Sequence, residues 1–77
     1  MFKAIVEIPL CKPTLRHCKF KVPGKYEIEL TAEDVGKTTV LTIVLRPEEN
    51  YKVTIKEIAK ELKWLINHVK GYCTENA

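Results

Sequence analysis

The hydrophobic pattern between residues 51 and 73 predicts one long amphipathic helix. Apolar residues recur there at alternating spacings of three and four positions, which places them along one side of an α-helix. Thr54 and Glu57 have the spacing of a capping box, and Gly71 is a typical stop signal. We therefore expect a helix over residues 54–72. Its apolar positions are Ile55, Ile58, Leu62, Leu65, Val69 and Tyr72.

The residues before this helix alternate between apolar and polar side chains, which is the pattern of β-strands. Between the third and fourth strands, residues 31–36 are predicted as a turn or a single helical turn capped by Thr31. The four predicted strands cover residues 2–8, 15–22, 26–30 and 38–45.

The second and third strands are expected to form a hairpin whose loop is residues 23–25. A three-residue loop keeps the apolar side chains of both strands on one face, whereas a two-residue loop would mix the faces. The same register sets Lys19 opposite Glu29 and Lys21 opposite Glu27. Opposite charges across neighbouring strands favour this pairing.

These elements predict an α+β fold: a four-stranded antiparallel sheet (ββββα) with the long C-terminal amphipathic helix on one face. The 77 residues are expected to form a single small domain, covering residues 1–77. The predicted core comprises Phe2, Val6, Ile8, Phe20, Val22, Tyr26, Ile28, Leu30, Ile58, Leu62, Leu65 and Val69.

The fourth strand is apolar on both faces, and one helix can cover only one of them. One face carries Leu41, Ile43 and Leu45, and the other carries Val40, Thr42 and Val44. We therefore predict a homodimer formed through the uncovered face of the sheet, and the pattern does not decide which face this is.

Trp64 is predicted to lie on the opposite side of the helix from the sheet, because it falls about 180° from Ile55 at about 100° per residue. Tryptophan is enriched at protein interfaces and stacks on nucleic-acid bases. The candidate interface residues are Leu41, Ile43, Leu45 and Trp64.

The composition is that of an ordinary globular protein, with 45% hydrophobic and 30% charged residues. Lysine and glutamate are abundant while serine and glutamine are absent, a composition typical of thermophiles. No apolar run is long enough for a membrane span, and the first residues lack the apolar core of a secretory signal. We expect a cytoplasmic protein that does not bind membranes.

Few residues suit catalysis or a metal site, so we expect neither an enzyme nor a cofactor. Residues 36–38 resemble the end of a phosphate-binding loop, but Thr31 stands where that loop needs glycine. Cys11 and Cys18 are too far apart for the short paired spacing of structural zinc sites. Cys18 is predicted as a small core residue, and a disulfide between Cys11 and Cys18 remains an alternative.

Basic residues gather in the first third of the chain and suggest a nucleic-acid-binding surface. Two hypotheses follow: binding of single-stranded DNA or RNA, or binding of another protein. Basic side chains that converge on one surface would favour nucleic acid, whereas pairing with carboxylates would favour a protein partner. The candidate nucleic-acid-binding residues are Lys12, Arg16, His17, Lys19, Lys21 and Lys25.

The order of four strands and one helix, basic at its start, is similar to that of the small dimeric single-stranded-DNA-binding domains of transcriptional coactivators. That resemblance is one of topology over residues 2–73, and it implies pairing through the C-terminal helices and strand binding on a curved sheet. The outward sheet positions are mostly lysine, glutamate and threonine, so the sequence assigns no family.

Overall fold

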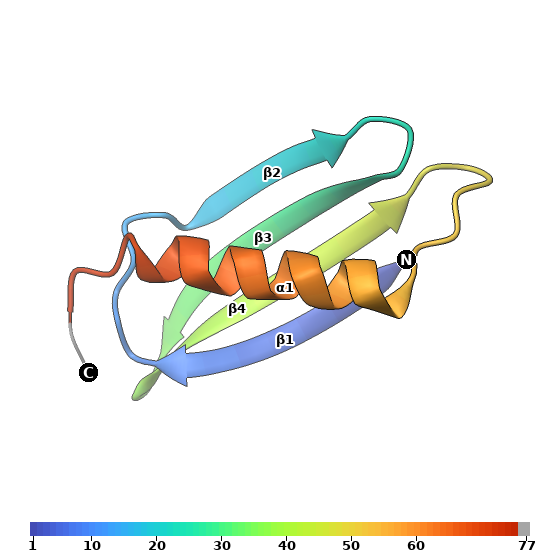
Figure 1. The fold of residues 1–77 in the computed structure, drawn as a ribbon. Helices are drawn as coiled ribbons and strands as arrows, with labels where there is room; N and C mark the ends of the chain where they lie inside the picture. The colour runs from blue at the N-terminus through green and yellow to red at the C-terminus, as the bar shows by residue number, and fades with distance from the viewer. Residues whose placement is uncertain (76–77) are drawn as a thin grey trace.

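The chain forms a four-stranded antiparallel sheet followed by one helix, as the sequence predicted. A computed structural model describes residues 1–75. Figure 1 shows the helix lying diagonally across one face of the sheet, whose strand order is β1-β4-β3-β2. The elements are β1 (Phe2–Pro9), β2 (His17–Val22), β3 (Tyr26–Val35), β4 (Thr38–Pro47) and α1 (Ile55–Lys70).

The hairpin of β2 and β3 has the predicted three-residue loop and the predicted register. Val22 pairs with Tyr26, and Lys19 lies opposite Glu29. The amide of Lys25 donates to the carbonyl oxygen of Val22 at 3.0 Å. Gly24 has φ 76, a left-handed conformation that glycine adopts without steric strain.

The prediction of a turn over residues 31–36 is wrong, because β3 continues to Val35. Ala32 is buried and the residues around it alternate as in a strand. Val35 pairs with Thr38, so the connection to β4 is only Gly36 and Lys37. Pairing with β4 over the whole length of β3 overrides the local turn tendency of this polar stretch.

α1 begins at the predicted capping box. The Thr54 hydroxyl accepts from the amide of Glu57 at 3.1 Å, and the Glu57 carboxylate accepts from the amide of Thr54 at 3.2 Å. Leu65 and Val69 are fully buried, but Ile55 at the first position is 86% exposed and Tyr72, just beyond the last helical residue, is 42% exposed. The buried side of the helix is thus narrower than the predicted apolar stripe.

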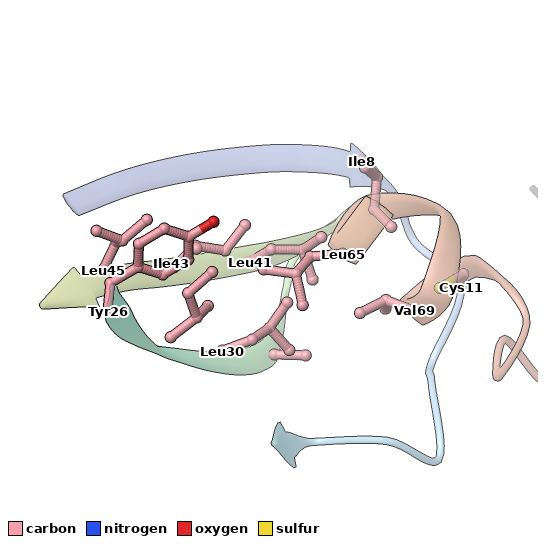
Figure 2. Packing of buried hydrophobic residues seen from close by; sticks show 11 residues of the cluster. Ile8, Cys11, Tyr26, Leu30, Leu41, Ile43, Leu45, Leu65 and Val69 are labelled. Carbon is pink, nitrogen blue, oxygen red and sulfur yellow. The ribbon is translucent and has the colours of Figure 1, made fainter. Parts of the chain in front are cut away.

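The core lies between the sheet and α1, and β4 contributes its centre. Leu41, Ile43 and Leu45 are 0 to 2% exposed, because β4 lies between β1 and β3 directly beneath the helix. Figure 2 shows these side chains gathered with Leu65 and Val69 in the interior. These three residues face α1 in the core. The expectation that Leu41, Ile43 and Leu45 form an interface is therefore wrong.

The remaining predicted core residues divide into two groups. Phe2, Val6, Phe20, Val22 and Leu62 are only partly buried but pack against the core, and Ile58 is half-buried. The predicted core residues that are buried in the structure are Ile8, Tyr26, Ile28, Leu30, Leu65 and Val69.

The end of α1 is attached to the connection between β1 and β2. A disulfide joins Cys11 to Cys73, which are 62 positions apart in the sequence and 4.9 Å apart at Cα. The amide of Thr14 donates to the carbonyl of Tyr72 at 3.0 Å, and that of Thr74 donates to the carbonyl of Cys11 at 2.9 Å. The alternative disulfide between Cys11 and Cys18 is not formed, and Cys18 carries a free thiol.

Within residues 1–75, no helix combines the length and the apolar character that crossing a bilayer requires.

Candidate functional site

The predicted basic residues are each paired with a carboxylate rather than gathered on one surface. Arg16 contacts Asp34 at 2.7 Å and His17 contacts Glu29 at 2.8 Å. The other four pairs have nitrogen-to-oxygen distances of 3.2 to 4.0 Å. They join Lys12 to Glu75, Lys19 to Glu27, Lys21 to Glu48, and Lys25 to Glu57.

These pairs are also scattered over the molecule. His17, Lys19 and Lys21 lie on the face of the sheet that α1 does not cover, because they alternate with the inward-facing Cys18 and Phe20. Lys12 and Arg16 lie in the connection between β1 and β2, and Lys25 lies in the β2–β3 loop. The structure thus does not bring the six residues together.

The open face of the sheet carries a network of mixed charge. Arg46 on β4 contacts Glu29 at 3.1 Å and Glu27 at 3.8 Å. Hydrogen bonds from His17 and then from Arg46 hold the pKa of Glu29 below its ordinary value. Exposed ion pairs contribute little stability, but they neutralise the basic side chains of β2 locally.

Four lysines on α1 have no carboxylate partner among the described residues. Salt bridges within residues 1–75 do not include these side chains. Their spacing of four, three and seven places them along one side of the helix, away from the sheet. They are Lys56, Lys60, Lys63 and Lys70.

Trp64 lies on the flank of α1 above β2 and not directly away from the sheet, which corrects the prediction. Its ring meets that of Phe20 edge to face, with centroids 5.7 Å apart. The core direction of the helix is set by Leu65 and Val69 and not by the exposed Ile55, from which the prediction counted. Trp64 is therefore half-exposed, at 50%.

Trp64 begins a row of rings that follows the same flank of α1 and ends just beyond its last residue. The Trp64 and His68 rings are stacked, with centroids 4.6 Å apart and planes inclined by 13°. The Tyr72 ring meets that of His68 edge to face at 5.3 Å. His68 and Tyr72 were not predicted as functional, although spacings of four residues from Trp64 place all three on one side of a helix.

A shallow hollow of about 280 Å³ lies beside Trp64, between the helix and β2. It is lined by the apolar side chains of Phe20, Val22 and Trp64 and by the charged residues Lys60 and Glu61. Its size and lining suit one apolar side chain of a partner.

Within residues 1–75, no group of three or more His, Cys, Asp or Glu side chains is placed to hold a metal ion. Burial raises the pKa of the Cys18 thiol, which lowers its share of reactive thiolate.

No family model matches the sequence, and neither a curated protein nor a solved structure matches the chain. The topological similarity to single-stranded-DNA-binding domains therefore gains no support from the comparisons.

Proposed function

We propose that this chain is a small non-catalytic module that binds another protein through the hollow formed by Phe20, Val22 and Trp64. An apolar side chain of the partner enters the hollow, and polar groups of the partner meet Lys60 and Glu61, the two charged residues that line it. Interfaces of this type have an apolar, aromatic-rich centre and a polar edge.

The observation that carries this proposal is the pairing of the six basic residues. Each of them has a carboxylate within 4.0 Å, so a phosphate would have to displace an existing partner at every position. Nucleic-acid affinity depends on basic groups that are available to neutralise phosphates. Pairing of the basic side chains with carboxylates is the arrangement that favours a protein partner over nucleic acid.

The aromatic row supports the same conclusion. Trp64 is held against Phe20 and His68, so a partner would meet an anchor whose orientation is already fixed. A pre-positioned aromatic side chain loses little conformational freedom on binding. Such residues commonly dominate the binding energy of an interface.

Binding of single-stranded DNA or RNA is the second candidate, and the free lysines of α1 favour it. In that case Lys60 and Lys63 would contact phosphates while Trp64 stacks on a base. This version of the hypothesis moves the nucleic-acid surface from residues 12–25 to the helix.

The proposal is tested by selecting displayed random peptides on the wild-type protein and counter-selecting them on Trp64→Ala. Trp64 is the only tryptophan in the chain, so its fluorescence reports directly on the hollow. We expect selected peptides with a large apolar anchor, a change in Trp64 fluorescence on binding, and at least about a tenfold loss of affinity in Trp64→Ala. The matched control Lys63→Ala should retain binding.

A parallel titration with single- and double-stranded oligonucleotides separates the two candidates. Nucleic-acid binding should weaken steeply between about 50 and about 200 mM salt. Salt-dependent binding that Lys60→Glu with Lys63→Glu abolishes, together with no peptide that discriminates Trp64→Ala, would replace the proposal with the second candidate.

A further inference from the structure

β1 is a free edge of the sheet. It pairs with β4 on one side, and Figure 1 shows its other side bordered by no further strand. It is eight residues long, and its only proline, Pro9, is the last residue. Long edge strands are templates for pairing with another chain unless charges, prolines or bulges prevent it.

The backbone groups that β1 presents to this free edge follow from one hydrogen bond. The amide of Leu10 donates to the carbonyl oxygen of Lys37 at 3.1 Å, in line with the register of β1 on β4. In an antiparallel pair, residues that hydrogen-bond to the neighbouring strand alternate with residues whose backbone N–H and C=O groups point away from it. In β1, the backbone groups of the odd-numbered residues therefore point away from β4. Pro9, which has no N–H group, falls among these outward residues, where the missing donor leaves β4 unaffected. The residues with a free amide and a free carbonyl are Lys3, Ile5 and Glu7.

The side chains of the same three residues lie on the open face of the sheet. Ile5 is 64% exposed, among the most exposed large hydrophobic residues of the molecule. Lys3 and Glu7 take part in no salt bridge within residues 1–75. The edge therefore carries an exposed apolar centre with one unpaired charge of each sign at equal distance on either side.

We propose that a second copy of this chain pairs with the first along β1, antiparallel, about a two-fold axis through Ile5. Ile5 then faces Ile5 of the partner subunit, and Lys3 faces Glu7 of the partner subunit. The two-fold axis repeats the second contact, so both charges on both chains gain an opposite partner. Two four-stranded sheets become one continuous sheet with both helices on the same face.

The pairing also completes the apolar layer on the helix side. Phe2 falls opposite Ile8 of the partner subunit, and Ala4 opposite Val6 of the partner subunit. Phe2, Ala4 and Val6 are only half-buried, whereas the corresponding positions of the central strand β4 are fully buried. A partner strand would cover the side of these residues that the edge leaves open.

The charges select one register. Outward-facing backbone groups must meet outward-facing groups, so the register can shift only in steps of two residues. A shift of two in one direction sets Lys3 opposite Ile5 of the partner subunit. The same shift in the other direction sets Glu7 opposite Ile5 of the partner subunit. Either shift removes both charge pairs from the central positions.

The opposite edge of the sheet does not offer this complementarity. β2 is six residues long, and its open-face side chains are His17, Lys19 and Lys21. Antiparallel pairing of β2 with itself centred on Lys19 sets a lysine opposite a lysine, which is unfavourable, and β2 offers no carboxylate to pair with these cations in any register. The hollow beside Trp64 lies over β2, so pairing through β1 leaves it accessible at both ends of the dimer.

Sedimentation equilibrium at micromolar concentration tests the proposal, and exchanging charges keeps the test independent of folding. We expect a wild-type dimer. Lys3→Glu and Glu7→Lys alone should each weaken association about tenfold or more, because both symmetric pairs become repulsive. The double variant Lys3→Glu with Glu7→Lys should restore it. An equimolar mixture of the two single variants should form a heterodimer, since each chain then offers the charges that the other lacks.

Two further measurements distinguish the edge dimer from sheets that pair face to face. Thr42 neighbours Ile5 on the open face, so Thr42→Lys should leave the edge dimer intact while Ile5→Lys abolishes it. Amide hydrogen exchange should slow at Ile5 on dimerisation, while Ala4 and Val6 are protected at all concentrations. A monomeric wild type, a dimer lost in Thr42→Lys but kept in Ile5→Lys, or a double charge exchange that fails to restore association would each overturn the proposal.

Discussion

The Thr39 hydroxyl connects the amide of Cys11 to the carboxylate of Asp34. It accepts from the Cys11 N–H and donates to Asp34 Oδ1, both at 3.0 Å. Thr39 is fully buried, and Asp34 also accepts from Arg16 at 2.7 Å. The hydrogen bond from Arg16 holds the pKa of Asp34 below its ordinary value, which keeps this carboxylate charged. One buried hydroxyl thus ties β4 to the connection that follows β1.

Replacing Thr39 with valine should destabilise the protein by about 1–3 kcal/mol, because the Cys11 amide is left without a partner in the interior. Urea denaturation measures the change. Thr42→Val, on the open face of the same strand, is the matched control and should stay within about 0.5 kcal/mol. Equal effects at the two positions would show that the buried hydrogen bond contributes nothing specific.

Loss of the disulfide between Cys11 and Cys73 should lower the free energy of unfolding by about 2–5 kcal/mol, because it closes a long loop. Cys73→Ala and reduction of the wild type should have similar effects on thermal unfolding. Cys18→Ser should keep the sensitivity to reductant, since Cys18 is not bridged. A wild-type melting temperature that does not change when reductant is added would contradict the stabilising role of this disulfide.

The helix phase predicts different costs for two aliphatic residues of α1. Leu65→Ala should destabilise by about 2–5 kcal/mol, as expected for a fully buried side chain. Ile55→Ala should change stability by no more than about 0.5 kcal/mol, because Ile55 is exposed. Chemical denaturation of both variants checks the phase, and a reversed order would mean that the helix is rotated on the sheet.

The Tyr51 hydroxyl donates to Glu57 at 2.5 Å, and this bond should make stability depend on pH at both extremes. It raises the pKa of Tyr51 from 10.0 to about 12 and, together with the capping bonds from Thr54, lowers the pKa of Glu57. The lowered pKa of the Glu57 carboxylate means that the charged form stabilises the fold at neutral pH. This contribution disappears as pH falls through the folded-state pKa of Glu57. The raised pKa of Tyr51 means that its protonated phenol stabilises the fold below the ordinary pKa of tyrosine. This contribution is lost as pH rises toward the folded-state pKa of Tyr51.

Tyr51→Phe should therefore melt below the wild type over a plateau around neutral pH, with the difference shrinking in acid and in strong alkali. Thermal unfolding followed by circular dichroism across this range measures it. Tyr72→Phe is the control, because the Tyr72 hydroxyl makes no side-chain hydrogen bond among the described residues. A difference between Tyr51→Phe and the wild type that stays constant at every pH would rule out the coupling.

The sequence by itself determined most of the elements, because each depends on neighbours along the chain. The second half of β3 is the exception, since its pairing with β4 decided it. A period of two defines the strands, a period of three to four defines α1, and the capping box at Thr54 sets where the helix begins. The register of β2 on β3 was also determined locally, since a short loop and the alternation of faces allow only one pairing.

Only the tertiary structure decided how these elements are ordered and which faces they bury. The pattern of β4 showed two apolar faces, but its register sets Leu41 beside Val6 and Ala32 on the face that α1 covers and leaves Thr42 on the open face. The disulfide of Cys11 with Cys73 and the contact of Trp64 with Phe20 join segments far apart in sequence. Periodicity says which residues share a face, whereas long-range packing decides what that face meets.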